Sequence, residues 1–119
     1  MAQVAKRKLS GSTDGRNIKV VATATPGTLV HTAVTGTTAG TWDEVWLWAY
    51  NSDSVARQVV VQWGGTTAPD DTNAVTLPPV SGLVLVVPGL ILQNGTVVRA
   101  FCGTANVVMV SGYVNAVTA

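Results

Sequence analysis

The chain has 119 residues, of which 47% are hydrophobic and only 11% are charged, and its formal net charge is +1. This composition excludes a disordered chain, because there is ample apolar surface to bury, and the length suits one hydrophobic core. A typical globular domain carries roughly 25% charged residues. We therefore expect a homo-oligomer in which subunits cover part of one another's uncharged surface.

The basic residues are concentrated at the start of the chain. Residues 1–17 are rich in Ser, Gly and Thr and lack helical or strand periodicity. We predict an extended basic N-terminal arm over residues 1–17 and a single domain over residues 18–119. The residues expected to bind a partner are Lys6, Arg7, Lys8 and Arg16. Docking on an acidic protein, a merely solvated terminus and nonspecific contact with phosphates remain open, but the acidic body argues against a specific nucleic-acid site.

From residue 18 onward the sequence predicts an all-β domain, because Val, Thr, Ala and Gly dominate and turn signals recur at short intervals. The expected strands cover residues 18–25, 28–35, 42–50, 56–63, 73–77, 82–87, 90–93, 96–103 and 106–114. The segment 90–93 either forms its own strand or extends the preceding one past a bulge, which gives about eight strands. No crossover helix is expected, so we predict an antiparallel β-sandwich or jelly roll.

The strand over residues 42–50 is apolar on both faces. One face presents Trp42, Glu44, Trp46, Trp48 and Tyr50, and the other presents Val45, Leu47 and Ala49. Either the aliphatic face fills the core while the aromatic face meets a subunit or ligand, or the tryptophans are core. The same two-sided character recurs in residues 59–61, 83–87 and 107–110, which favours a subunit interface. The predicted interface residues are Trp42, Trp46, Trp48 and Tyr50.

Few residues are available for catalysis or metal binding. His31 is the only histidine and lies within a predicted strand, where a structural role is expected. Cys102 is the only cysteine, so no intrachain disulfide forms, as suits a reducing cytoplasm. Asp70 and Asp71 follow a proline and indicate a turn. We predict no catalytic residue, no metal site and no cofactor. We therefore expect that the protein is not an enzyme.

The sequence also bears on membranes and carbohydrates as partners. The apolar stretch over residues 80–92 is too short and too interrupted by Gly and Pro to span a bilayer, so no membrane association is expected. Carbohydrate binding is the alternative to a structural role, because exposed tryptophans, Trp63 among them, stack well on sugar rings. Glu44 is the single charged group on the aromatic face of residues 42–50, whereas sugar sites usually add several polar partners.

Several phrases, in this order, resemble small virion structural proteins of tailed bacteriophages. They are WDEVWLWAYN (42–51), VQWGGT (61–66), PDD (69–71), VVPGL (86–90), NG (94–95) and GYVN (112–115). The resemblance is to proteins that decorate or cement the head. It implies a β-sandwich or jelly roll, often trimeric, that is made in the host cytoplasm and bridges major capsid proteins on the capsid surface. A tail, neck or fibre component shares these features and remains the alternative location.

Overall fold

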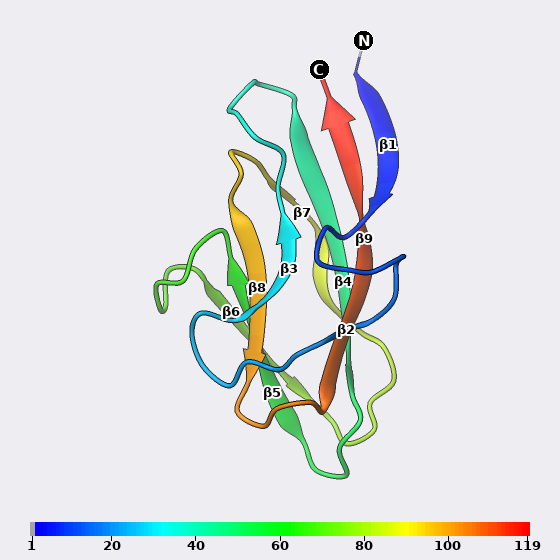
Figure 1. Ribbon diagram of the computed structural model, residues 1–119, viewed down its shortest axis with the longest axis vertical. Helices are drawn as coiled ribbons and strands as arrows, with labels where there is room; N and C mark the ends of the chain where they lie inside the picture. The colour runs from blue at the N-terminus through cyan, green and yellow to red at the C-terminus, as the bar shows by residue number, and fades with distance from the viewer. Residues whose placement is uncertain (1) are drawn as a thin grey trace.

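Two antiparallel β-sheets, packed as a sandwich, make up the computed structural model, which describes residues 2–119 (Figure 1). The predicted antiparallel β-sandwich is thereby confirmed. The strands are β1 (Gln3–Lys8), β2 (Ile18–Lys19), β3 (Thr28–Thr32), β4 (Trp42–Asn51), β5 (Arg57–Trp63), β6 (Thr72–Leu77), β7 (Val84–Leu92), β8 (Val97–Cys102) and β9 (Val108–Thr118). Residues 2–119 contain no helix long and apolar enough to cross a membrane.

The five-stranded sheet has the order β1-β9-β4-β7, and the short strand β2 also pairs with β9. The four-stranded sheet has the order β3-β8-β5-β6. Strands β4 and β9 form the longest ladder, which runs from Trp42 opposite Val117 to Asn51 opposite Val108. This ladder lies at the centre of the five-stranded sheet, and it fixes which residues of the two strands share a face.

The core lies between the two sheets and consists mainly of valine. Alternation along β4 buries Val45, Leu47 and Ala49, with Asp43 and Asn51 on the same side, while the residues between them point away from the core. Burial of a valine or leucine side chain contributes roughly 1.5–3 kcal/mol. The buried partners on the other strands include Val59, Val61, Val98, Ala100, Cys102, Val108, Val110 and Val114.

The N-terminal segment differs from the expected extended arm. Residues Gln3–Lys8 form β1, which pairs with β9 from Gln3 opposite Thr118 to Lys8 opposite Tyr113. Leu9 is buried in the core, and the Gly11 N–H donates to the Val30 carbonyl at 2.9 Å. Backbone hydrogen bonds hold β1, and all six of its residues are exposed, so no apolar alternation marks it in the sequence. The two termini lie side by side at one end of the sandwich (Figure 1).

Several other expected strands have different bounds; the one expected over residues 28–35, for example, ends at Thr32. The segment expected over residues 18–25 pairs only as Ile18–Lys19, because the chain then leaves β9 and crosses toward the four-stranded sheet. There the buried Gln62 side chain accepts from the Gly27 N–H at 2.7 Å and donates to Thr25 Oγ1 at 2.9 Å. The segments expected over residues 82–87 and 90–93 are one strand, β7, whose register against β4 shifts near Pro88 and Gly89.

Candidate functional site

The outer face of the five-stranded sheet carries the aromatic side chains of β4. Trp42, Trp46, Trp48 and Tyr50 are half-buried and lie on the side of the strand away from the core. The aliphatic side of β4 is buried, so the interpretation that the aliphatic face fills the core is confirmed. The alternative, in which the tryptophans form the core, is wrong.

Tyr113 of β9 joins these residues, because it lies directly opposite Trp46 in the ladder. The Trp46 ring centroid lies 6.4 Å from that of Trp48 and 6.4 Å from that of Tyr113, with interplanar angles of 20° and 17°. The centroids of Trp48 and Tyr113 are 6.0 Å apart, with an interplanar angle of 28°. Such offset stacking orders the rings before any partner binds. We call this set the aromatic face; its members are Trp42, Trp46, Trp48, Tyr50 and Tyr113.

Hydrogen bonds and a glycine fix the Trp46 indole in the aromatic face. Its Nε1–H donates to Glu44 Oε1 at 2.7 Å, and Asn115 Nδ2 donates to the same oxygen at 3.1 Å. These two hydrogen bonds, that from Trp46 first, lower the pKa of the Glu44 carboxyl below its ordinary value of 4.5. Gly89 of β7 lies under the indole, where an added Cβ would stand 2.6 Å from Trp46 Cζ2.

The four basic residues expected to bind a partner are placed in different surroundings. The Lys6 ammonium lies 4.5 Å from the centroid of the Tyr113 ring, so it borders the aromatic face. Arg7 and Lys8 line a cleft between the two sheets. Arg16 lies in the loop between β1 and β2, away from the others, where its N–H donates to the Thr13 carbonyl at 2.9 Å. The predicted cluster is therefore divided among three places.

Strand β7 borders the aromatic face on the opposite side from Lys6. Its open edge carries no charged residue, and its side chains Leu85 and Ile91 are 45% and 51% exposed. Leu85 lies opposite Trp48 and Ile91 lies opposite Glu44. Apolar surface therefore continues from the aromatic face to the edge of the sheet.

Tyr113 and Asn115 belong to this surface although neither is a predicted interface residue. The predicted last strand contains Tyr113 but ends at residue 114, whereas β9 continues to Thr118 and includes Asn115. The alternation of Met109, Ser111, Tyr113, Asn115 and Val117 on the outer face is a signal for the longer strand. The pairing of β9 with β4, which brings Tyr113 beside Trp46, has no such local signal.

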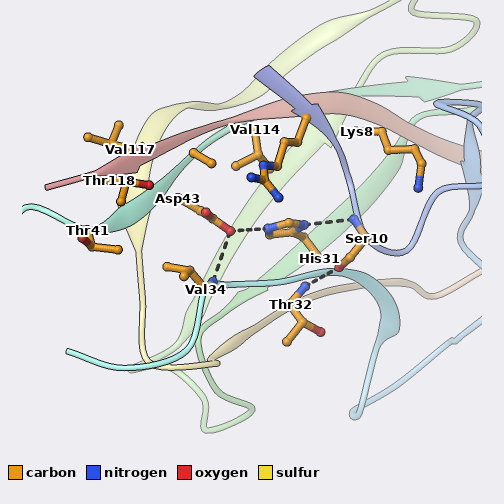
Figure 2. A pocket seen from close by; sticks show the side chains of 12 residues that line it. Lys8, Ser10, His31, Thr32, Val34, Thr41, Asp43, Val114, Val117 and Thr118 are labelled. Carbon is orange, nitrogen blue, oxygen red and sulfur yellow. Dashed lines mark hydrogen bonds and ion pairs between the residues drawn. The ribbon is translucent and has the colours of Figure 1, made fainter. Parts of the chain in front are cut away.

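A second candidate site is a cleft of about 610 Å³ between the two sheets, at the end where the termini lie (Figure 2). His31 of β3 and Asp43 of β4 are buried beside it, with Nε2 of the imidazole 2.7 Å from Asp43 Oδ2. The Ser10 N–H donates to His31 Nδ1 at 3.0 Å, and the Val34 N–H donates to Asp43 Oδ2 at 3.2 Å.

These hydrogen bonds engage both nitrogens of the His31 ring. Because Nδ1 accepts an amide N–H, the proton of the neutral ring lies on Nε2 and is donated to Asp43. Ser10 Oγ accepts from the Thr32 N–H at 2.7 Å and makes no hydrogen bond to the imidazole. The serine, histidine and aspartate thus lack the contact between nucleophile and base that a catalytic triad requires. Their arrangement ties the N-terminal segment, β3 and β4 together, which is the structural role expected for His31.

Asp43 is a further residue of this site that is absent from the sequence predictions. It alternates with Val45 and Leu47 and is therefore on the core side of β4. A carboxylate at a core position needs a polar partner, and the single histidine of the sequence, His31, is a candidate for that partner.

Other candidate groups have local roles. Cys102 is a buried free thiol. Asp71 Oδ2 accepts from the Thr67 N–H at 3.1 Å, so this carboxylate stabilises its own turn. Within the described residues, no group of three or more His, Cys, Asp or Glu side chains is placed to hold a metal ion.

Comparisons with protein-family models, with curated proteins and with solved structures found no match to this chain.

Proposed function

We propose that the chain is a structural virion protein that decorates and cements the capsid of a tailed bacteriophage. It forms homo-oligomers and bridges neighbouring major capsid subunits. The observation that carries the proposal is the aromatic face, an ordered and half-exposed set of rings that continues into the exposed Leu85 and Ile91 of β7. Contiguous apolar surface of this kind marks a protein contact, and aromatic residues are enriched in such contacts.

The basic residues of β1 support a second contact, with an acidic capsid surface. Arg7 and Lys8 make no ion pair with any carboxylate in residues 2–119. Lys6 borders the aromatic face, so the charges of Arg7 and Lys8 are those available to an acidic partner. Such charges steer the approach to an acidic surface and fix orientation more than they add affinity. Many copies bound on one lattice would convert modest single contacts into strong total binding.

Occupancy of capsids tests the proposal. Heads of the phage that encodes this chain, prepared without the protein, are mixed with purified wild type, W48T or F101T and then sedimented. Phe101 lies opposite Val60 on the outer face of the four-stranded sheet and provides the matched control. Loss of an interface aromatic costs about 2 kcal/mol, or roughly thirtyfold in affinity. We expect that loss for W48T and wild-type occupancy for F101T; equal occupancy of all three, or none, contradicts the proposal.

A tail, neck or fibre component would use the same surface. The two locations are distinguished by the part of the virion in which the protein is found. Heads and tails of the phage are purified apart, and the chain is quantified in each by mass spectrometry. We expect it in the head fraction at many copies per particle. Recovery with the tails would move the proposal to that part of the virion.

Carbohydrate binding is the second candidate, because Glu44 and Asn115 provide polar groups beside the Trp46 ring. Against it, Gly89 lies under that ring and the Lys6 ammonium lies over Tyr113, so parts of these two ring faces are already covered. Titration with chitohexaose and cellohexaose, followed by tryptophan fluorescence, separates the two candidates. We expect no saturable quenching; saturable quenching lost in W48T would favour the sugar site.

A further inference from the structure

We infer that two copies of this chain pack face to face through the outer faces of their five-stranded sheets, about a twofold axis that runs along β9. The inference rests on the proposed function, since it names the subunit that covers the aromatic face. It differs from the threefold assembly that the resemblance implies, because a twofold contact joins the same surface on both copies.

The charges on this face are arranged in a row across three strands. Lys6 of β1 lies opposite Asn115 of β9, and Asn115 lies opposite Glu44 of β4. Directly opposed residues of antiparallel strands point to the same side of the sheet. With strands about 4.8 Å apart, the Lys6 and Glu44 backbones are about 10 Å apart. Within residues 2–119, neither side chain forms an ion pair.

The twofold axis lies above β9 and parallel to it. Rotation about this axis places β1 of one copy over β4 of the other, and each residue keeps its position along the strand direction. Lys6 of one copy then meets Glu44 of the other, and symmetry makes this pair twice. The asparagine between them faces its own counterpart. The contact therefore supplies each unpaired charge of this row with an opposite charge.

Two further rows also place favourable partners on the two sides of β9. In each row a β9 residue separates a residue of β1 or β2 from one of β4. The rows pair Val4 with Trp42 across Val117 and Lys19 with Tyr50 across Met109. The rotation places an apolar side chain on Trp42 and the Lys19 ammonium group on Tyr50. Apolar contact and cation–π contact are both favourable pairings for these rings.

The size of this face is adequate for a stable contact. Strand β9 has 11 residues, which span about 35 Å at about 3.3 Å per residue. Three strands are about 14 Å wide, which gives a flat area of about 500 Å² per copy. Two such flat faces bury about 1,000 Å² in total, and the surface of the side chains adds to this area. The total reaches the size of a specific interface. Leu85 and Ile91 of β7 lie outside the contact and remain available to the capsid.

Charge reversal in the full-length protein tests the inference. We measure mass by light scattering on a sizing column for wild type, K6E and E44K, each alone and as an equimolar mixture of the two variants. We expect a wild-type dimer that weakens in 1 M NaCl, and variants whose dimers are at least about tenfold weaker because like charges oppose. In a heterodimer of K6E and E44K, position 6 of each copy again meets an opposite charge at position 44 of the other. The mixture should therefore form a heterodimer. D70K, a reversal in an exposed loop, should remain a wild-type dimer.

The outcomes separate this inference from the proposed function. A wild-type monomer or trimer, an unweakened variant dimer, or a mixture that stays monomeric overturns the twofold contact. Circular dichroism melts of K6E and E44K exclude unfolding as the cause of dissociation. If K6E is monomeric yet occupies capsids like wild type, the dimer stands but is not needed on the virion. If wild type dimerises and never binds capsids, the proposed function fails and the twofold contact stands.

Discussion

The buried side chain of Asn51 is the strongest single point at which to perturb the sandwich. It lies at the end of β4 and is fully buried. Its Nδ2 donates to the carbonyl oxygens of Val55, Leu77 and Pro78 at 2.9, 3.3 and 3.1 Å. Its Oδ1 accepts from the Asp53 N–H at 2.9 Å. The amide thus joins the turn after β4 to the end of β6.

The substitution Asn51→Asp keeps the size of this side chain and replaces the donor group with an oxygen. Three carbonyl oxygens then face a carboxyl group that has no access to water. Burial and this acceptor-rich environment raise the pKa of the new carboxyl by about two to three units. At about 1.36 kcal/mol per unit, the loss of unfolding free energy at pH 7 is about 3–4 kcal/mol. A domain of this length has a total of roughly 6–18 kcal/mol.

The loss depends on pH with a definite sign. The folded pKa is raised above that of the unfolded chain, so the penalty is absent below the unfolded value of about 3.9, grows as pH rises from there, and is complete once pH has risen through the folded value. Urea unfolding, followed by tryptophan fluorescence at pH 4 and pH 7, measures it. The matched control is Asn73→Asp at an exposed position of β6, which should stay within about 0.5 kcal/mol of wild type. An equal loss for N51D at both pH values would refute the reasoning.

Three other predictions follow from single contacts. Gly112→Ala places a methyl group against the Trp46 carbonyl oxygen and should lower the unfolding free energy by about 3 kcal/mol, whereas Gly36→Ala, with open space around it, should cost about 1 kcal/mol in urea unfolding. The hydrogen bonds that lower the pKa of Glu44 stabilise the fold above pH 4.5 and are lost as pH falls through the lower folded pKa, so tryptophan emission should titrate in acid for wild type but not for Glu44→Gln. The buried Cys102 thiol should react with a thiol reagent only at the rate of unfolding, and rapid labelling without urea would contradict its burial.

Local patterns were sufficient to predict the strands that face the core on one side only. The alternation over residues 42–50 gave β4 to within one residue, because the period of two is a property of the strand itself. The Asn94-Gly95 pair correctly marked the connection between β7 and β8, whose residues take positive φ values of 67° and 66°. These features depend on residues close together in the chain.

The remaining features depend on partners far away in the sequence. His31 and Asp43 meet only because β3 and β4 belong to different sheets that pack together. Gln62 reads as an exposed polar residue, and it is buried because the segment before β3 folds over it. Neither the neighbours of these residues nor their periodicity carries this information.

The basic N-terminal segment shows how such a long-range pairing alters a functional argument. On a flexible arm, Lys6 and Lys8 would have to be ordered when a partner binds, at a cost of about 1–2 kcal/mol per residue for the backbone. On β1 the pairing with β9 has already fixed them, at a spacing of about 6.6 Å along one strand. Binding then requires only the ordering of two side chains, and the contact becomes specific for position as well as charge. A deletion of residues 2–16 would therefore expose an edge of β9 and remove Leu9 from the core, so charge reversal on an intact β1 is the sharper test of what these lysines bind.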